Sequence, residues 1–383
     1  MKVSGDWIRR PASQAVCAML AGAGFQALFV GGCVRNALLD EPVGDIDIAT
    51  DARPEEVIEL ARKTGFKSVP TGLDHGTVTV VAEHIPHEIT TFRRDIETHG
   101  RHATVAFSKD VSEDARRRDF TMNALYAMAD GTVIDPLDGL PDLTARRVRF
   151  IDDAGQRIRE DYLRILRFFR FHAWYGDPAQ GLDADGLAAV ADHVEGLMGL
   201  SRERVGAEII KLLTAPDPAP AVAAMRAGGV LTAVLPGADD RLLAPLVHIE
   251  AMVAADPDPL RRLAALGGGD PSDRLRLSKA QARQLDLLRN EMSLMRKPAE
   301  LGYRFGPETG RDVLTLRAAM FEVPPSQGDL ADLTRGAAAA FPVKATDLMP
   351  EFDGPALGAR LKELEQHWID ADFAPTKDRL LAL

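Results

Sequence analysis

The sequence feature that most constrains the fold is an apolar segment that ends in two adjacent glycines. Ala27–Val30 predicts a short buried strand, and Gly31 and Gly32 separate it from a helix predicted over Val34–Leu39. Two residues without side chains would let a phosphate group approach the backbone N–H groups of that helix start, and Arg35 would add a positive charge. A tight turn between strand and helix also prefers glycine, so the pair alone leaves both interpretations open.

An aspartate pair follows shortly afterwards. A second strand is predicted over Asp45–Ala49, and Asp45 and Asp47 flank Ile46 in it. Because alternate residues of a strand share one face, the two carboxylates should project together. Paired carboxylates can share hard cations such as Mg²⁺, and two such ions roughly 3.5–4 Å apart can activate an attacking hydroxyl and neutralise a leaving pyrophosphate. A solvated turn after Gly44 is the ordinary alternative, but the preceding glycine pair favours a metal-dependent site for a nucleoside triphosphate.

Three more residues are candidates for the same site. Glu88 is a charge within a predicted half-buried strand, His87–Phe92, and either completes the metal site or lies on an exposed face. In the cluster that begins at Arg117, Arg118 can hold a triphosphate and Asp119 can accept a hydrogen bond from a ribose hydroxyl. A solvated run of charges at a helix start is the alternative for that cluster.

A ladder of charges marks a later helix, predicted from Asp161 to Trp174. Asp161, Arg164, Arg167 and Arg170 recur at every third position, so successive members should touch and wind over one helix face. An aspartate accepts hydrogen bonds and an arginine only donates them. Cytosine and adenine place an amino donor beside a ring-nitrogen acceptor, whereas guanine and uracil place a carbonyl beside an N–H. A rigid Asp161–Arg164 pair therefore suits C and A, and unpaired polar groups would cost G and U about 1–3 kcal/mol each. An ion-paired amphipathic helix is the alternative.

The chain changes character along its length. Up to about residue 150 it mixes strands and helices, with a hairpin predicted from Thr77–Ala82 and His87–Phe92, and short strands around Thr132–Ile134 and Val148–Ile151. Residues 93–114 are polar with little periodicity and are predicted to form a mobile loop. After about residue 155 strand signals stop, and breaks rich in Pro and Gly divide a helical remainder.

Bulk composition limits location and partners. A length of 383 residues exceeds one typical core, and a net charge of −11 argues against indiscriminate adhesion to nucleic acid. Residues 261–317 nevertheless hold twelve Lys and Arg against seven Asp and Glu, which is a candidate surface for RNA phosphates or simply a solvated helical surface. Two cysteines, Cys17 and Cys33, cannot build a disulfide framework, so a reducing cytoplasm is expected. We expect no signal peptide at Ala15–Val30, which glycines interrupt, and no membrane span.

Five motifs occur in an order that resembles a known family. They are Gly-Gly-x-Val-Arg, Asp-x-Asp, Arg-Arg-Asp-Phe-Thr-x-Asn-Ala, the segment Asp135–Gly139, and Glu-Asp-x-x-Arg-x-x-Arg, and they cover residues 29–170. The order resembles the class II tRNA nucleotidyltransferases, which are the CCA-adding enzymes and their poly(A) polymerase relatives. The segment Ser201–Arg204 also resembles the neck of that family. The resemblance implies an α+β fold with a small mixed sheet in a catalytic head (residues 1–150), followed by an all-α neck (151–214) and a helical body and tail (215–383).

The resemblance also implies an activity: template-independent addition of CMP and AMP to the 3′ end of tRNA, from CTP and ATP, with pyrophosphate released and two Mg²⁺ ions bound. The implied metal ligands are Asp45 and Asp47, and we add Glu88 as a third catalytic candidate. The nucleotide-binding candidates, among which Asp161 and Arg164 would read the base, are Gly31, Gly32, Arg35, Arg118, Asp119, Asp161, Arg164, Arg167 and Arg170. Residues 93–114 would match the flexible loop of the family, and Asp135–Gly139 a hinge-like element.

One departure and several alternatives remain. Asn36 stands where the family usually has an aspartate, which puts a structural role of that carboxylate in doubt. A poly(A) polymerase, or an enzyme that adds only CC or only A, would share these motifs, although the segment Thr71–Thr77 favours CCA addition over a basic polymerase-type strand. A non-catalytic tRNA-binding protein would be expected to lack an aspartate of the pair, and a small-molecule nucleotidyltransferase would not need the long helical remainder. The oligomeric state stays open.

Overall fold

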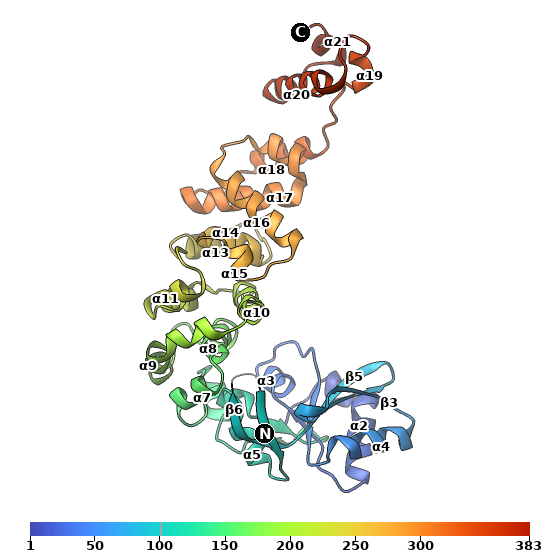
Figure 1. The fold of residues 1–383 in the computed structure, drawn as a ribbon, viewed down its shortest axis with the longest axis vertical. Helices are drawn as coiled ribbons and strands as arrows, with labels where there is room; N and C mark the ends of the chain where they lie inside the picture. The colour runs from blue at the N-terminus through green and yellow to red at the C-terminus, as the bar shows by residue number, and fades with distance from the viewer. Residues whose placement is uncertain (100–101) are drawn as a thin grey trace. The chain divides into compact units, whose positions relative to one another are not determined.

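The computed structural model, drawn in Figure 1, describes residues 1–99 and 102–383. It divides into two compact units, Met1–Pro236 and Gly237–Leu383. The domain limits predicted at residues 150 and 214 stay predictions. Among the described residues, no helix combines the length and the apolar character that crossing a bilayer requires.

The N-terminal unit contains a mixed β-sheet. Among the described residues its strand order is β3-β4-β5-β2-β1-β8-β9, in which β2 and β5 are parallel and the other neighbours are antiparallel. The mixed sheet predicted from the sequence is thereby confirmed. The strands are β1 (Leu28–Val30), β2 (Asp47–Thr50), β3 (Lys67–Gly72), β4 (Thr77–Ala82), β5 (Ile85–Thr91), β8 (Tyr126–Ala127) and β9 (Val133–Ile134).

The two faces of this sheet differ in polarity. Helices α2 (Pro11–Gly22) and α4 (Pro54–Thr64) pack on β4 and β5, and Figure 1 shows them beside these strands. Beneath α2, the buried His87 of β5 lies 3.1 Å from the hydroxyl of Ser13, from Nε2 to Oγ. On the opposite face, Thr79, Glu88 and Asp47 lie abreast as register partners across β4, β5 and β2. The strands therefore bury one face and present a row of polar side chains on the other.

Two predictions in this unit are wrong. The segment 93–114, predicted as a mobile loop, contains a two-stranded ribbon, β6 (Arg93–His99) and β7 (His102–Phe107), although residues 100–101 lie outside the described residues. The ribbon pairs with no third strand in the described part of the chain, and its polar sequence with little periodicity gives no strand signal. At Val148–Ile151 the structure has a single bridge, from Phe150 to Phe120, in place of a strand.

The remaining elements of the N-terminal unit are helical. After residue 155 the described residues contain no strand, as the sequence predicts. The further helices and 3₁₀ turns are α1 (Asp6–Arg9), α3 (Gly32–Leu38), η1 (Leu73–His75), α5 (Val111–Arg116), η2 (Thr121–Asn123), α6 (Leu140–Thr144), α7 (Ala154–Glu160), α8 (Leu163–Tyr175), α9 (Ala184–His193), η3 (Val194–Gly199), α10 (Arg202–Leu213), α11 (Ala219–Ala227) and α12 (Val230–Val234).

Helices α8 and α10 pack against each other and carry the predicted base-reading segment. Their apolar faces are buried: Phe168 of α8 stacks on Phe150 with ring centroids 5.3 Å apart, and Ile209 of α10 is 2% exposed. Ser201 caps α10 through its hydroxyl. Asp161 does not belong to α8: it lies in an extended conformation between α7 and α8, so the predicted helix begins two residues late.

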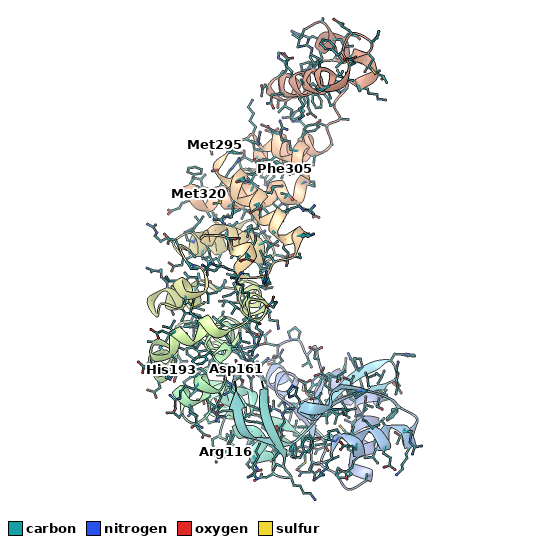
Figure 2. The ribbon with its side chains drawn as sticks, in the orientation of Figure 1. Arg116, Asp161, His193, Met295, Phe305 and Met320 are labelled. Carbon is teal, nitrogen blue, oxygen red and sulfur yellow. The ribbon has the colours of Figure 1, made fainter. Side chains whose placement is uncertain are left out.

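The C-terminal unit is helical throughout its described length. Its helices are α13 (Leu243–Met252), α14 (Pro259–Leu266), α15 (Pro271–Arg274), α16 (Lys279–Ser293), α17 (Pro298–Phe321), α18 (Gln327–Ala337), α19 (Ala345–Leu348), α20 (Gly354–Asp370) and α21 (Lys377–Leu381). Figure 2 labels Met295, Phe305 and Met320 in this unit.

The basic segment predicted at residues 261–317 is only partly a surface. Arg261 and Arg262 are buried, and both donate to the carboxylate of Glu250. Arg317 is also buried, and it donates to the backbone carbonyl of Glu291. These three arginines hold helices together, because buried cations require partners. They are therefore not available to RNA phosphates.

Candidate active site

Three acidic side chains meet at the polar face of the head sheet. Asp47 of β2 and Glu88 of β5 are register partners on adjacent parallel strands. Asp45 precedes β2 and is exposed, whereas Ile46 is buried, so the alternation predicted from the sequence is present. All three line a hollow of about 550 Å³ together with Arg10.

The carboxylates are electrostatically unfavourable to one another. Burial, followed by the charge of Glu88, raises the pKa of Asp47 to about 6, and Asp45 acts in the same direction. Arg118 opposes this shift and lowers the pKa. Asp47 thus lies within the field of two further carboxylates and one guanidinium, which is the environment that a bound cation would stabilise.

The donor set fits an ion bound jointly with substrate better than a protein-only cage. Among the described residues, no three His, Cys, Asp or Glu side chains form a group able to hold a metal ion. Mg²⁺ usually takes one or two protein carboxylates and completes its shell with water and phosphate oxygens. Asp45 and Asp47 supply two such carboxylates in one hollow.

The glycine turn brings the backbone close to a positive group. Gly31 follows β1 with φ 71°, a conformation that favours glycine, and Gly32 begins α3. A Cβ atom on Gly31 would lie 3.3 Å from Nη1 of Arg118. The guanidinium of Arg118 is fixed by the carboxylate of Asp114 at 3.0 Å and by the Tyr126 hydroxyl at 3.2 Å. A strand end, a helix start and a guanidinium therefore lie together.

Arg35 is less accessible than the sequence suggests. It is 6% exposed, and burial lowers its pKa. It donates to Asn123 Oδ1 at 2.5 Å and to the Tyr175 hydroxyl at 2.8 Å, and its guanidinium lies 4.0 Å from the centroid of the Tyr175 ring. Arg35 thus ties α3 to the end of α8. Its contact with a nucleotide stays a prediction.

Asp119 and Arg167 form an ion pair between the head and α8. Nε of Arg167 donates to Oδ2 of Asp119 at 2.7 Å, and Asn123 donates to Oδ1 at 2.8 Å. Burial raises the pKa of Asp119, but the stronger combined effect of Arg167 and Asn123 lowers it to about 2. The carboxylate is therefore ionised and firmly held, and its predicted bond to a ribose is untested.

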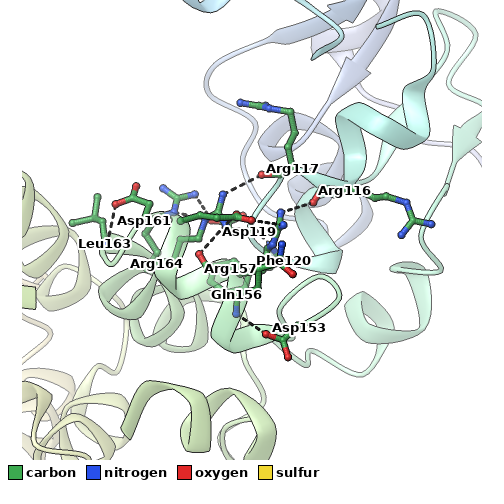
Figure 3. A network of polar contacts seen from close by, with 12 residues as sticks. Arg116, Arg117, Asp119, Phe120, Asp153, Gln156, Arg157, Asp161, Leu163 and Arg164 are labelled. Atoms are coloured by element: carbon green, nitrogen blue, oxygen red, sulfur yellow. Dashed lines mark hydrogen bonds and ion pairs between the residues drawn. The ribbon is translucent and has the colours of Figure 1, made fainter. Parts of the chain in front are cut away.

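The two predicted base-reading side chains are each bonded to a partner of their own (Figure 3). Arg164 donates to Glu160 at 2.6 Å and to the backbone carbonyls of Arg157 and Arg117 at 2.9 and 3.1 Å. Asp161 accepts from Nη2 of Arg204 at 2.6 Å. The expected side-chain contact within the ladder is replaced by these partners, because Asp161 lies outside the helix that carries Arg164.

Sequence reasoning missed the partners on α10. Arg170 of α8 donates to Glu208 at 2.6 Å, and Arg204 lies one turn earlier than Glu208 on α10. Opposite charges four residues apart on one helix were the available signal, but they usually indicate a bond within that helix. Here Arg204 and Glu208 bond instead to two members of the ladder, Asp161 and Arg170.

Two further motif positions have structural partners. Asn36 accepts from Nη2 of Arg35 at 2.8 Å and donates from Nδ2 to the carbonyl of Pro42 at 2.8 Å. Asp135 accepts from the N–H groups of Gly139 and Leu140 at 2.8 and 2.9 Å, which orders the start of α6. The hinge-like role of Asp135–Gly139 stays a prediction.

Comparison with known proteins agrees with this arrangement. The family model described as the poly A polymerase head domain matches residues 27–149, and the one described as a probable RNA and SrmB-binding site of polymerase A matches residues 182–242. The chain therefore carries this head domain, and its 31% identity to a CCA tRNA nucleotidyltransferase over 92% of its length shows that it belongs to the family of CCA tRNA nucleotidyltransferases and poly(A) polymerases.

Three relatives illustrate the likeness. The mitochondrial CCA tRNA nucleotidyltransferase 1 of Mus musculus is 31% identical over 367 residues, covering 92% of this chain and 85% of the relative. The CCA-adding enzyme of Geobacillus thermodenitrificans is 42% identical over 216 residues, covering 56% of this chain and 52% of that relative. The crystal structure of the Bacillus stearothermophilus CCA-adding enzyme in complex with CTP has a TM-score of 0.78 at 30% identity, covering 97% of this chain and 95% of that one.

Proposed function

We propose that this chain adds CMP and AMP to the 3′ end of tRNA, from CTP and ATP, and releases pyrophosphate. The observation that carries the proposal is the hollow in which Asp47 and Glu88 are register partners with Asp45 beside them. It occurs in a chain whose relatives over most of its length are named CCA-adding enzymes or CCA tRNA nucleotidyltransferases.

Each side chain has a proposed task. Asp45 and Asp47 would hold Mg²⁺, which when bound activates the 3′ hydroxyl and neutralises the departing pyrophosphate. Arg118, fixed by Asp114, binds the triphosphate as a charged donor. Asp161 accepts from the amino group of cytosine or adenine, and Arg164 donates to the neighbouring ring nitrogen.

The test is an addition assay with purified protein and a tRNA that ends before CCA. CTP alone should add two nucleotides, CTP with ATP should complete the CCA end, and UTP or GTP alone should add none. Long adenosine tracts from ATP alone would indicate a poly(A) polymerase, and a halt after CC or a requirement for a CC end would indicate a partial enzyme. Binding of tRNA without any addition would leave only a binding protein.

We also propose a cytoplasmic location. Cys17 and Cys33 are both buried free thiols, and burial raises the pKa of the Cys33 thiol to about 11. Such thiols are compatible with a reducing compartment. Relatives named as mitochondrial make fractionation of the native cells the direct test.

A further inference from the structure

We propose that Arg204 is a positioning residue for base choice, which it exerts by holding the carboxylate of Asp161. This inference rests on the proposed role of Asp161 in reading the incoming base. Nη2 of Arg204 lies 2.6 Å from Oδ2 of Asp161, and both side chains are about one quarter exposed (26% and 22%). A charge-assisted bond of this length is among the stronger contacts that an aspartate can make.

Asp161 needs support from outside its own element. It has φ −154° and ψ 105° and lies between α7 and α8, so no helical backbone fixes its side chain. Its Oδ1 accepts from the backbone N–H of Leu163 at 3.1 Å, but this donor is neutral, whereas the bond from Arg204 is charge-assisted and shorter. The bond from Arg204 is therefore the principal restraint on the orientation of the carboxylate.

The restraint leaves the carboxylate able to read a base. An ionised carboxylate offers about four acceptor positions, and Leu163 and Arg204 occupy one each. The other positions remain for an amino group of the incoming nucleotide. Arg204 thus fixes the orientation of the Asp161 carboxylate and leaves acceptor positions free for a base.

Arg204 is itself held in place. Its backbone N–H donates to the hydroxyl of Ser201, the N-cap of α10, at 3.4 Å. One turn later, Glu208 bonds to Arg170 at 2.6 Å, so α10 is tied to both ends of the charged ladder. Helix α10 therefore acts as the rigid support for the acceptor of the base-reading pair.

The experiment compares Arg204→Gln and Arg204→Lys with the control Lys211→Ala, which removes an exposed charge from the same helix. The readout is the ratio of kcat/KM for CTP to kcat/KM for UTP on tRNA that ends before CCA. Arg204→Gln should lower this ratio about tenfold or more, mainly through a higher KM for CTP, because a charged hydrogen bond is lost. Arg204→Lys should recover part of the ratio, and Lys211→Ala should leave it unchanged.

Glu208→Gln separates positioning from helix packing. It removes the Arg170–Glu208 ion pair, which joins α8 to α10, so it should change the KM values for CTP and UTP by similar factors and preserve their ratio. If it lowered the ratio as much as Arg204→Gln does, the effect would belong to helix packing and the inference would be overturned. Melting temperatures identify any variant that fails to fold, and in that case Arg204→Lys decides.

Asp161→Asn separates this inference from the proposed function. If Asp161→Asn retains full base choice, the base-reading role itself fails. If Asp161→Asn loses base choice while Arg204→Gln keeps it, only the role of Arg204 fails. If both lose it, the double variant should lose no more than Asp161→Asn alone, because Arg204 acts through Asp161.

Discussion

The carboxylates of the head hollow lie near like charges, whereas the charged side chains of the neck segment are paired with opposite charges. In the head, Asp47 faces the like charges of Glu88 and Asp45, and its pKa is raised to about 6. In the neck segment, the charges of the ladder have opposite partners, namely Arg204 for Asp161, Glu160 for Arg164, Asp119 for Arg167 and Glu208 for Arg170.

This difference separates two kinds of work. A cluster of like charges is unfavourable until a cation arrives, so the head hollow gains stability from binding an ion. A ladder of opposite pairs is satisfied in advance, so its side chains need little rearrangement to recognise a base. The head hollow is thus suited to bind a cation, and the neck segment is suited to keep its charged side chains in fixed positions.

The largest expected effect comes from breaking the head cluster. Asp47→Ala should lower nucleotide addition more than about a thousandfold, because loss of a ligand to the reacting ion costs several kcal/mol. The measurement is single-turnover addition of labelled CMP to tRNA, with tRNA binding recorded in parallel and expected to persist. Glu55→Gln, an exposed carboxyl of α4, is the control. Activity within tenfold of the parent would contradict the metal assignment.

The next largest effect is expected on base discrimination, when a side chain of the ladder is removed. Arg164→Ala should lower discrimination between CTP and UTP about tenfold or more, because the donor to the ring nitrogen is lost. Competition between labelled CTP and UTP measures it. The control is Arg159→Ala, which removes an exposed arginine of α7 whose partner is His193. Unchanged selectivity would reject the role of Arg164 in reading the base.

The ion pair between Asp119 and Arg167 should contribute to the free energy of unfolding in a defined pH range. Asp119→Asn should lower the free energy of unfolding by about 1–3 kcal/mol near neutral pH, since Arg167 is partly exposed and solvent weakens the pair. The pKa of Asp119 in the folded chain is about 2, below its unfolded value. The contribution is therefore complete above about pH 4 and is lost as the pH falls towards 2. Urea unfolding near pH 7 and near pH 3 tests this, and an equal difference at both would contradict it.

Asp47, in the carboxylate cluster of the head, should contribute to stability with a pH dependence of the opposite sign. Because the folded pKa of Asp47 is raised to about 6, the folded chain binds this proton more tightly than the unfolded chain does. Its contribution is greatest at low pH and falls as the pH rises from about 4 to about 6. Without metal at about pH 8, Asp47→Asn should therefore be more stable than the parent, by less than about 3 kcal/mol. Added Mg²⁺ should raise the melting temperature of the parent only. If the parent were at least as stable as Asp47→Asn in the absence of Mg²⁺, this prediction would be contradicted.

Elements with a packed face were predictable from the sequence, and those without one were not. Helix α8 lies within two residues of its predicted bounds, because its apolar face is buried against a core. The predicted breaks rich in Pro and Gly fall between helices, since these residues end helices by local chemistry. Strand β3 was missed because it lacks a buried face, and the β6–β7 ribbon was missed because its sequence is polar with little periodicity.

The candidate site follows a similar rule. The shared direction of Asp45 and Asp47 follows from strand alternation, which is local. The position of Glu88 beside Asp47 depends on parallel pairing between β2 and β5, which the local pattern does not specify. The choice of Arg204 as the partner of Asp161 is likewise tertiary, because the pair is 43 residues apart in the sequence.

Asn36 gives the smallest effect and shows where a family pattern and this chain differ. Its amide accepts from Arg35 and donates to the carbonyl of Pro42, in the segment that leads to Asp45. Asn36→Asp restores the residue usual in the family but removes the donor and places a carboxylate oxygen against a carbonyl. Asn36→Asp should therefore lower the free energy of unfolding by about 1 kcal/mol, as expected for one lost hydrogen bond. It should also raise the Mg²⁺ concentration needed for half-maximal addition, because the segment before Asp45 loses a restraint. Thermal unfolding and a Mg²⁺ titration measure the two effects, and a variant as stable as the parent would show that either side chain suits this position.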